Sequence, residues 1–226
     1  MSLAVHPVVL RPRDAVYSAL KRAILMNELQ PNAALTELGL AQSMGCSQGT
    51  VREALLRLQE DGLVRRSGHR GTSVTPLDSA AAVEMLALRR QIETRAAPVA
   101  APAIDAAVMV RLVELRAEMD RHARAGDAFA LAECDIRFHL AIFRQAGFEA
   151  LEPILNRVML HTYRHKLWEP RHSRALAETA ARHDAILAAI PLGGAALAEA
   201  LGRHIDTIVE IDPDAPAVAS VSGTLK

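Results

Sequence analysis

The sequence predicts a mainly α-helical protein, with a small N-terminal part that contains a β-hairpin and a larger all-helical bundle after it. Half of the 226 residues are hydrophobic but only 3% are aromatic, and Ala and Leu are abundant, which favours helices packed on helices. Apolar residues recur at helical spacing through most of the chain. Gly and Pro residues interrupt these segments, and Pro76 marks the boundary between the two parts.

The N-terminal part is expected to follow a flexible leader of residues 1–13 and to extend over residues 14–76. Asp14 is a suitable N-cap for a first helix, because its short side chain can accept a hydrogen bond from the first turn. This helix is predicted to end near Leu29, since Pro31 cannot continue it.

A tight turn joins two further helices in this part. The second helix is predicted from Leu35 to Met44, where Gly45 ends it, because glycine readily adopts the left-handed conformation that follows a helix. Ser47 is expected to cap a third helix that runs to about Asp61. The two helices therefore lie on either side of a two-residue turn.

A hairpin is predicted after the third helix. Leu63–Val64 and Ser73–Val74 flank the turn SGHRGT, in which Gly71 permits a tight reversal. Helix, turn, helix and hairpin in this order form a winged helix-turn-helix, a module that binds duplex DNA. The predicted fold is therefore an N-terminal winged helix-turn-helix followed by an all-α bundle.

The bundle is predicted over residues 79–210. Residues 211–226 are rich in small residues and contain proline, so a disordered tail is predicted there. Asp78 or Ser79 can cap the first helix of the bundle, and short loops with Gly or Pro separate the segments. Six helices are expected, over residues 79–100, 105–125, 127–146, 150–166, 172–190 and 194–210. Helices joined by short loops pack as a bundle.

Composition excludes several classes of protein. Lys plus Arg equals Asp plus Glu, at 26 each, so any DNA-binding charge must be local; residues 48–72 carry five Arg against three acids. Cys46 and Cys134 show no framework spacing, which suggests a reducing compartment. The first residues lack a signal-peptide pattern, and no apolar run is long enough to span a membrane. We therefore expect a cytoplasmic protein without a membrane partner.

The third helix has one apolar and one polar face. Its apolar residues recur at i, i+3, i+4 and i+7 and are expected to pack on the first two helices; they are Val51, Ala54, Leu55 and Leu58. The polar N-terminal end is expected to contact bases and phosphates, through Ser47, Gln48, Gly49, Thr50 and Arg52. In the hairpin, His69 and Arg70 are expected to reach the minor groove or the backbone, and Gly71 belongs to the same DNA-binding set because it permits the tight turn. The alternative is an ordinary solvated face of a small helical domain.

These residues resemble the GntR family of bacterial transcription regulators. The resemblance rests on Val51-Arg52-Glu53-Ala54-Leu55 with Leu58, on Asp61-Gly62-Leu63-Val64, and on Arg70-Gly71-Thr72 with Val74. It covers most of residues 14–76. The chain departs from the family at Gln48 and Gly49, where members commonly have Arg and then a small residue or Pro. The resemblance therefore implies a base contact at Arg52 more than at Gln48, and the operator sequence could differ accordingly.

The bundle carries polar side chains on apolar helix faces. Asp135 and His139 are four residues apart and share a face with Leu131 and Phe138 in the helix 127–146. A carboxylate on such a face is costly unless it is compensated. His183 and His204 also lie on apolar faces, and one Asp with three His suits Zn²⁺, Ni²⁺ or Mn²⁺. Taken separately, each His could also be an ordinary satisfied core residue.

The same residues resemble the ligand-binding (FCD) domain of the FadR-type branch of GntR regulators. In that branch an Asp-x-x-x-His and two later His residues hold a metal, and Asp135 to His139, His183 to Ile186 and His204 fit this pattern. The chain departs at Arg182, where an acid usually precedes the His, and at Gly194, where an Asp is common. Neither residue is an expected ligand. Six helices would fit the VanR-type subgroup.

Arg89 is the expected effector-binding residue. It shares a helix face with Ile92 and Glu93, and Leu88-Arg89-x-x-Ile92-Glu93 resembles the family motif in which the Arg meets an organic-acid carboxylate. The alternative is a simple i,i+4 salt bridge to Glu93. His161 and His165 form another i,i+4 pair, but without a third ligand we expect them to line the pocket or the surface.

The combined interpretation is a regulator, most simply a repressor, that binds double-stranded operator DNA as a homodimer and senses a small carboxylate through its metal. A metal-dependent hydrolase with a DNA-binding appendage is a rival hypothesis, although no general base stands at a motif spacing. In a third hypothesis the metal is purely structural and effector sensing is lost. Because the preferred interpretation is a regulator, no enzyme activity is expected.

Overall fold

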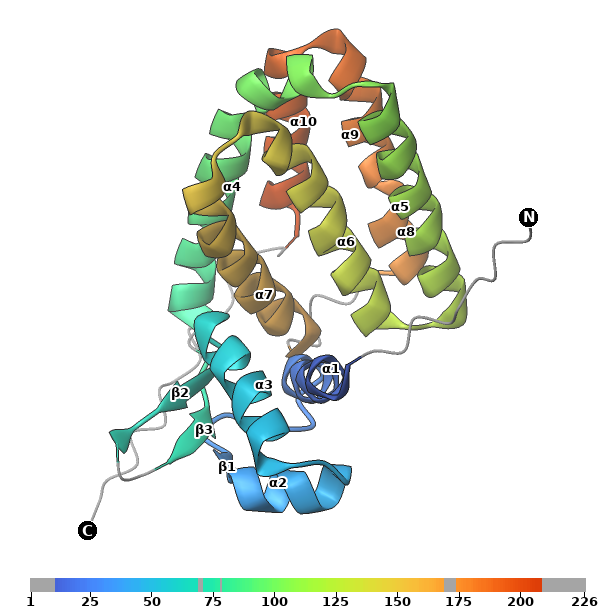
Figure 1. Ribbon diagram of the computed structural model, residues 1–226. Helices are drawn as coiled ribbons and strands as arrows, with labels where there is room; N and C mark the ends of the chain where they lie inside the picture. Colours follow the sequence, from blue (N-terminus) through green and yellow to red (C-terminus); the bar gives the residue numbers. More distant parts are fainter. Residues whose placement is uncertain (1–10, 69–70, 78, 169–173, 209–226) are drawn as a thin grey trace, which may run out of the picture.

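The computed structural model describes residues 11–68, 71–77, 79–168 and 174–208 (Figure 1). Its N-terminal part begins with three helices and contains a small sheet. The elements are α1 (Pro12–Leu25), β1 (Ala34–Leu35), α2 (Glu37–Met44), α3 (Gln48–Glu60), β2 (Val64–Arg66) and β3 (Thr72–Val74). Their order confirms the predicted winged helix-turn-helix. The apolar face predicted for α3 is also confirmed, because Val51, Ala54, Leu55 and Leu58 are all buried.

The ends of α2 and α3 follow from single residues. Gly45 ends α2 in the left-handed conformation, with φ of 62°, and the Ser47 side chain caps α3 by accepting a backbone hydrogen bond. The predicted start of the second helix at Leu35 is wrong. Thr36 caps this helix instead, through a hydrogen bond from the backbone amide of Gly39, and Leu35 belongs to β1.

The predicted limits of the first helix are wrong at both ends. The helix begins at Pro12, because the fixed φ of proline suits the first turn, so residues 12 and 13 are not part of a flexible leader. It ends at Leu25 rather than Leu29, since Asn27 takes a positive φ of 61°. Residues 1–10 and 209–226, which include the predicted tail, lie outside the described residues.

The sheet has the order β1-β3-β2, and both pairings are antiparallel. Val64 lies opposite Val74, and both side chains are buried against the helices. The predicted hairpin is therefore confirmed. Strand β1 was not predicted, because two residues are too few to show an alternating pattern.

The described residues of the bundle form seven α-helices instead of the expected six. They are α4 (Ser79–Ala100), α5 (Ala106–Ala125), α6 (Ala128–Phe143), α7 (Glu152–Trp168), α8 (Leu176–Ala181), α9 (His183–Ala189) and α10 (Gly194–Asp206). The additional helix arises because the predicted segment 172–190 is interrupted at Arg182. There the His183 ring bonds to the Ala180 carbonyl, which competes with the backbone hydrogen bonds of a continuous helix.

Helix α10 approaches α4 closely where α10 begins. A Cβ atom at Gly194 would lie 2.4 Å from the Cα of Pro98 in α4, so this position has no room for any side chain. This contact gives a physical reason for the departure from the family pattern at Gly194. None of the helices in the part of the chain described here is long and apolar enough to cross a membrane.

Helix α7 joins the bundle to the N-terminal part. It packs on α4 and α6, and its C-terminal end lies against α1 (Figure 1). Asn156 donates to the Asp61 carboxylate at 3.1 Å, just beyond the end of α3. At the other end of α7, the Trp168 indole donates to the carbonyl oxygen of Leu25 at 2.9 Å. Movement of α7 would therefore be felt at both α1 and α3.

Arg164 occupies the middle of this junction. Its Nη2 donates to the carbonyl oxygen of Thr75 at 2.7 Å, and its guanidinium carbon lies 4.2 Å from the Trp168 ring centre. The side chain is fully buried, yet its Nε and Nη1 have no hydrogen-bond partner. Burial lowers the pKa of Arg164 to about 10. No carboxylate of the described residues forms an ion pair with it.

A candidate metal centre and a candidate DNA-binding surface

The four predicted metal ligands converge inside the bundle. Asp135 and His139 lie on α6, His183 is the first residue of α9, and His204 lies on α10. One ligand atom from each residue lies within 4.8 Å of the other three. All four side chains are buried, with 0 to 6% of their surface exposed. The sequence spacing therefore identified residues that the fold brings together.

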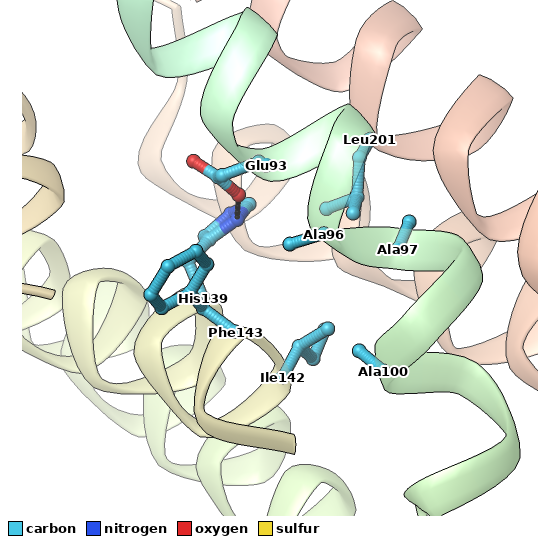
Figure 2. Close-up of a pocket in the computed structure, with 8 residues that line it drawn as sticks. All are labelled: Glu93, Ala96, Ala97, Ala100, His139, Ile142, Phe143 and Leu201. Carbon is cyan, nitrogen blue, oxygen red and sulfur yellow. Dashed lines mark hydrogen bonds and ion pairs between the residues drawn. The ribbon is translucent and has the colours of Figure 1, made fainter. Parts of the chain in front are cut away.

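Two of the imidazole rings are oriented by bonds on their outer nitrogens. His139 Nδ1 donates to Glu93 Oε2 at 2.5 Å, and Figure 2 shows these two side chains pointing toward one another from α6 and α4. His183 Nδ1 donates to the carbonyl oxygen of Ala180 at 3.2 Å. The Nε2 atoms then face Asp135, at 3.4 Å for His139 and 3.1 Å for His183. Such outer bonds are typical of histidines that ligate a metal.

The inner atoms of this cluster lack hydrogen bonds. The unsatisfied buried atoms are Asp135 Oδ1, His139 Nε2, His183 Nε2 and both ring nitrogens of His204. His183 Nε2 is close to Asp135 but not aligned with it as a hydrogen bond. Each such atom costs about 1–3 kcal/mol when it is left unpaired. A cation at the centre would satisfy one atom of each of these four residues together, so the residues fit a divalent metal.

The protonation states also fit a metal. Burial, followed by the neighbouring His183 and His139, holds the pKa of His204 well below its usual value, so its imidazole is neutral. Burial alone would raise the pKa of Asp135. The interactions of its carboxylate with His183, His139 and Arg89 outweigh burial and hold this pKa well below its usual value. A neutral imidazole and an ionised carboxylate are the forms that coordinate metals.

Arg89 lies beside the cluster, on α4, and is fully buried. Its Nε donates to Glu93 Oε1 at 2.6 Å, and its Nη2 is 3.9 Å from Asp135 Oδ1. The salt bridge to Glu93, which was the alternative to an effector-binding role, therefore exists. Both Nη atoms nevertheless lack a hydrogen-bond partner, so this edge of the guanidinium could pair with a ligand.

Glu93 is the residue of this site whose importance the sequence did not reveal. Its carboxylate bonds Arg89 through one oxygen and His139 through the other. Burial would raise the pKa of Glu93, but the charges of Arg89 and His139 lower it to about 2. The only indication in the sequence was the i,i+4 spacing to Arg89, which does not show the contact with α6.

A small apolar cavity adjoins Glu93 and His139. Figure 2 shows its lining, which comes from three helices: Ala96, Ala97 and Ala100 of α4, Ile142 and Phe143 of α6, and Leu201 of α10. The lining side chains pack so closely that this space has no room for a water molecule, and it is therefore not a ligand pocket in this arrangement.

His161 does not line the pocket or the surface as expected. It is buried on the side of α7 that faces the N-terminal part, where its ring lies near the backbone of Asp61 and Gly62. Burial, with the charges of Arg164 and Arg157, lowers the pKa of His161 to about 4. The prediction failed because periodicity does not show which neighbour covers a helix face.

The polar end of α3 is exposed, as a DNA-binding surface requires. Ser47, Gln48 and Gly49 are exposed, and the hydroxyls of Ser47 and Thr50 lie 2.9 Å apart. Gly71 has a φ of 76°, which the predicted tight turn needs. His69 and Arg70 lie outside the described residues. The guanidinium of Arg52 is exposed but bonded to Glu37 in α2.

Comparison with known families accounts for nearly the whole described chain. Residues 12–74 match the model of the bacterial regulatory proteins of the gntR family. Residues 84–207, more than half of the chain, match the FCD domain. The chain belongs to the GntR family. The FCD match places it in the FadR-type branch that the sequence resembled.

Several relatives of this GntR-family chain are named transcriptional regulators. LutR of Bacillus subtilis is 29% identical over 206 residues, which cover 81% of this chain and 93% of LutR. A regulator in an unstable DNA locus of Streptomyces ambofaciens is 34% identical over 136 residues, which cover 60% of this chain and only 56% of that protein. These relatives are regulators and not enzymes, so the hydrolase hypothesis has no support from them.

Solved structures show the same fold. The McbR/YncC protein of Escherichia coli matches with a TM-score of 0.72 and 22% identity, over 88% of this chain and 95% of that one. A GntR regulator of Rhodococcus sp. RHA1 matches with a TM-score of 0.63 and 24% identity, over 86% of this chain and 92% of that one. The GntR-family arrangement of a winged helix-turn-helix and an all-α bundle is therefore shared across distant relatives.

Proposed function

We propose that this chain is a homodimeric, ligand-responsive DNA-binding transcription regulator, acting as a repressor, that senses a small carboxylate through a metal in its bundle. Residues 14–76 would form the DNA-binding domain and residues 79–210 the sensor. The observation that carries the proposal is the convergence of one carboxylate and three imidazoles, with unsatisfied inner atoms, beside a buried arginine. A DNA-binding module of this kind commonly works as a dimer on a palindromic site.

Asp135, His139, His183 and His204 would hold the metal. Three nitrogen ligands and one oxygen ligand suit Zn²⁺, Ni²⁺ or Mn²⁺. When bound, the metal supplies a positive Lewis-acid site that a carboxylate can join. Arg89 would orient that carboxylate through its free Nη edge, because a guanidinium presents parallel donors to a carboxylate.

Helix α7 offers a physical connection from this site to the DNA-binding surface. Its Tyr163 is buried beside the site, with its ring centre 5.7 Å from the Arg89 guanidinium. The next residue, Arg164, donates to the Thr75 carbonyl that follows β3. An effector that prefers one position of α7 would therefore shift the orientation of the DNA-binding part, by an amount set by its differential affinity.

A thermal-shift screen tests the proposal directly. Mono-, di- and sugar carboxylates are added to metal-loaded protein, with and without a chelator. We expect a short-chain carboxylate to raise the melting temperature, and chelation to remove the rise, because the ligand binds at the metal. If the metal is purely structural, its removal would lower the melting temperature, and no carboxylate would change the melting temperature of the loaded protein. Turnover of an ester by the loaded protein would favour the hydrolase hypothesis.

The Glu93→Gln variant tests the support of His139. We expect its metal affinity to fall by about 10- to 100-fold, the usual effect of losing the outer partner of a ligating histidine. Titration against a chromophoric chelator measures this affinity. Glu114→Gln removes the same charge from the exposed face of α5 and serves as the control. Equal affinities in the two variants would show that Glu93 does not support a metal ligand.

A further inference from the structure

Glu37, the first residue of α2, bonds arginines from both parts of the DNA-binding surface. Arg52 of α3 donates to it through Nε, at 3.1 and 3.0 Å from the two carboxylate oxygens, and through Nη2 at 2.7 Å. Arg66 of β2 donates through Nη2 to the other oxygen, Oε1, at 2.9 Å. One carboxylate therefore ties together the second helix, the recognition helix and the hairpin.

The three side chains differ in exposure. The Glu37 side chain is 22% exposed, whereas those of Arg52 and Arg66 are 57% and 41% exposed. The carboxylate thus lies beneath two guanidinium groups that face solvent. The hydrogen bonds from Arg52 are the largest influence on Glu37, and with the charges of both arginines they lower its pKa despite partial burial. Glu37 is therefore ionised throughout the neutral pH range.

The bonds to Glu37 leave Arg52 able to contact DNA. A guanidinium has five N–H groups, and Glu37 occupies the edge formed by Nε and Nη2. Both hydrogens of Nη1 and one of Nη2 remain on the opposite end. Guanine presents its O6 and N7 atoms to two parallel donors, which this free end can supply. Glu37 therefore restricts the direction of Arg52 without blocking it.

We propose that Glu37 is a positioning residue for DNA recognition, which holds Arg52 and Arg66 in a fixed relation to each other before DNA binds. The inference rests on the DNA-binding part of the proposed function. Two long flexible side chains lose conformational freedom when they bind, and fixing them in advance reduces that cost for the correct sequence. Arg52 would then contact a base while Arg66 contacts the phosphate backbone of the DNA.

The test compares sequence preference, because overall affinity responds to any change of charge. Wild-type protein first selects a duplex from a randomised library, and a scrambled duplex of the same composition is the reference. The measured quantity is the dissociation constant for the scrambled duplex divided by that for the selected duplex, so a larger ratio means a stronger sequence preference. We expect Glu37→Gln to reduce this ratio by about tenfold or more, since a good bidentate base contact contributes about that much discrimination.

Two further variants separate positioning from simpler roles. Glu60→Gln removes the same charge from the exposed far end of α3 and should keep the ratio of wild type. Glu37→Asp keeps the charge that stabilises the N-terminus of α2, so it folds, but its shorter side chain cannot bond both arginines. We expect Glu37→Asp to lose the preference as well, while thermal unfolding stays close to wild type.

Three results would overturn the inference. If Glu37→Gln and Glu60→Gln show the same ratio, Glu37 influences DNA binding only through its charge and does not position Arg52. Tighter binding of the selected duplex by Glu37→Gln, with the ratio preserved, would show that Glu37 competes with DNA for Arg52. If wild type selects no sequence at all, the DNA-binding proposal fails together with the inference, and this outcome is visible before any variant is compared.

Discussion

The His183→Ala variant is expected to lose metal affinity by more than about 100-fold, because removing a ligand costs more than the 10- to 100-fold typical of removing its outer partner. His183 is fully buried, and its Nε2 lies 3.1 Å from Asp135. Alanine also leaves a gap that water can fill, so the bundle should stay folded. Metal content after dialysis, measured by mass spectrometry, gives the result.

His122→Ala is the matched control for this experiment. His122 lies on α5, near Glu118 and outside the cluster, and its loss should leave the metal content unchanged. Full metal occupancy in His183→Ala would rule out the proposed centre. Loss of metal from both variants would point to unfolding, which the far-ultraviolet circular dichroism of each variant would reveal.

The Arg52→Ala variant is expected to lose most of the preference for the selected duplex. Arg52 is exposed on α3 and is the residue for which the family resemblance implies a base contact. A bidentate contact to guanine contributes about 1–3 kcal/mol of discrimination. Binding to scrambled DNA should fall only slightly, because one of several positive charges is lost. Fluorescence anisotropy with both duplexes measures the difference.

Arg111→Ala provides the comparison for Arg52→Ala. Arg111 is exposed on α5 and pairs with Glu114, so its loss changes the net charge equally without touching the N-terminal part. Unchanged preference in Arg52→Ala would remove this residue from the recognition role. It would also leave Glu37 without a functional partner on α3, although the hydrogen bonds between the two side chains would still stabilise the fold.

Helical periodicity was sufficient to find the residues that face one another along a helix. Asp135 and His139 were identified because four residues make nearly one turn, and His183 and His204 because each lies on an apolar face. The winged helix-turn-helix was predictable for a similar reason, because Gly45 favours the end of one helix and Ser47 caps the start of the next. These features depend on neighbours close in sequence.

The remaining features depend on contacts between distant segments. Glu93 supports His139 across 46 residues, and Glu37 bonds Arg52 across 15 residues, so no local pattern indicates either pairing. The break at Arg182 was missed for another reason, because helical periodicity does not show that the His183 ring bonds to the Ala180 carbonyl. His161 was misplaced because the sequence does not show that α7 faces the N-terminal part. Tertiary contacts decided the points that concern Glu93, Glu37 and His161.

At the junction between the two parts of the protein, the buried guanidinium of Arg164 would gain hydrogen bonds to water if the junction opened. When α7 is packed against the N-terminal part, as in this structure, two nitrogens of this guanidinium have no partner. Separation of α7 from Thr75 would let solvent hydrate them, and the hydration energy recovered offsets part of the contacts that are lost. The junction is therefore held less tightly than its buried surface suggests. An effector acting at the neighbouring Tyr163 would therefore need less differential affinity to separate α7 from Thr75. Solutes that lower the activity of water should favour the packed arrangement.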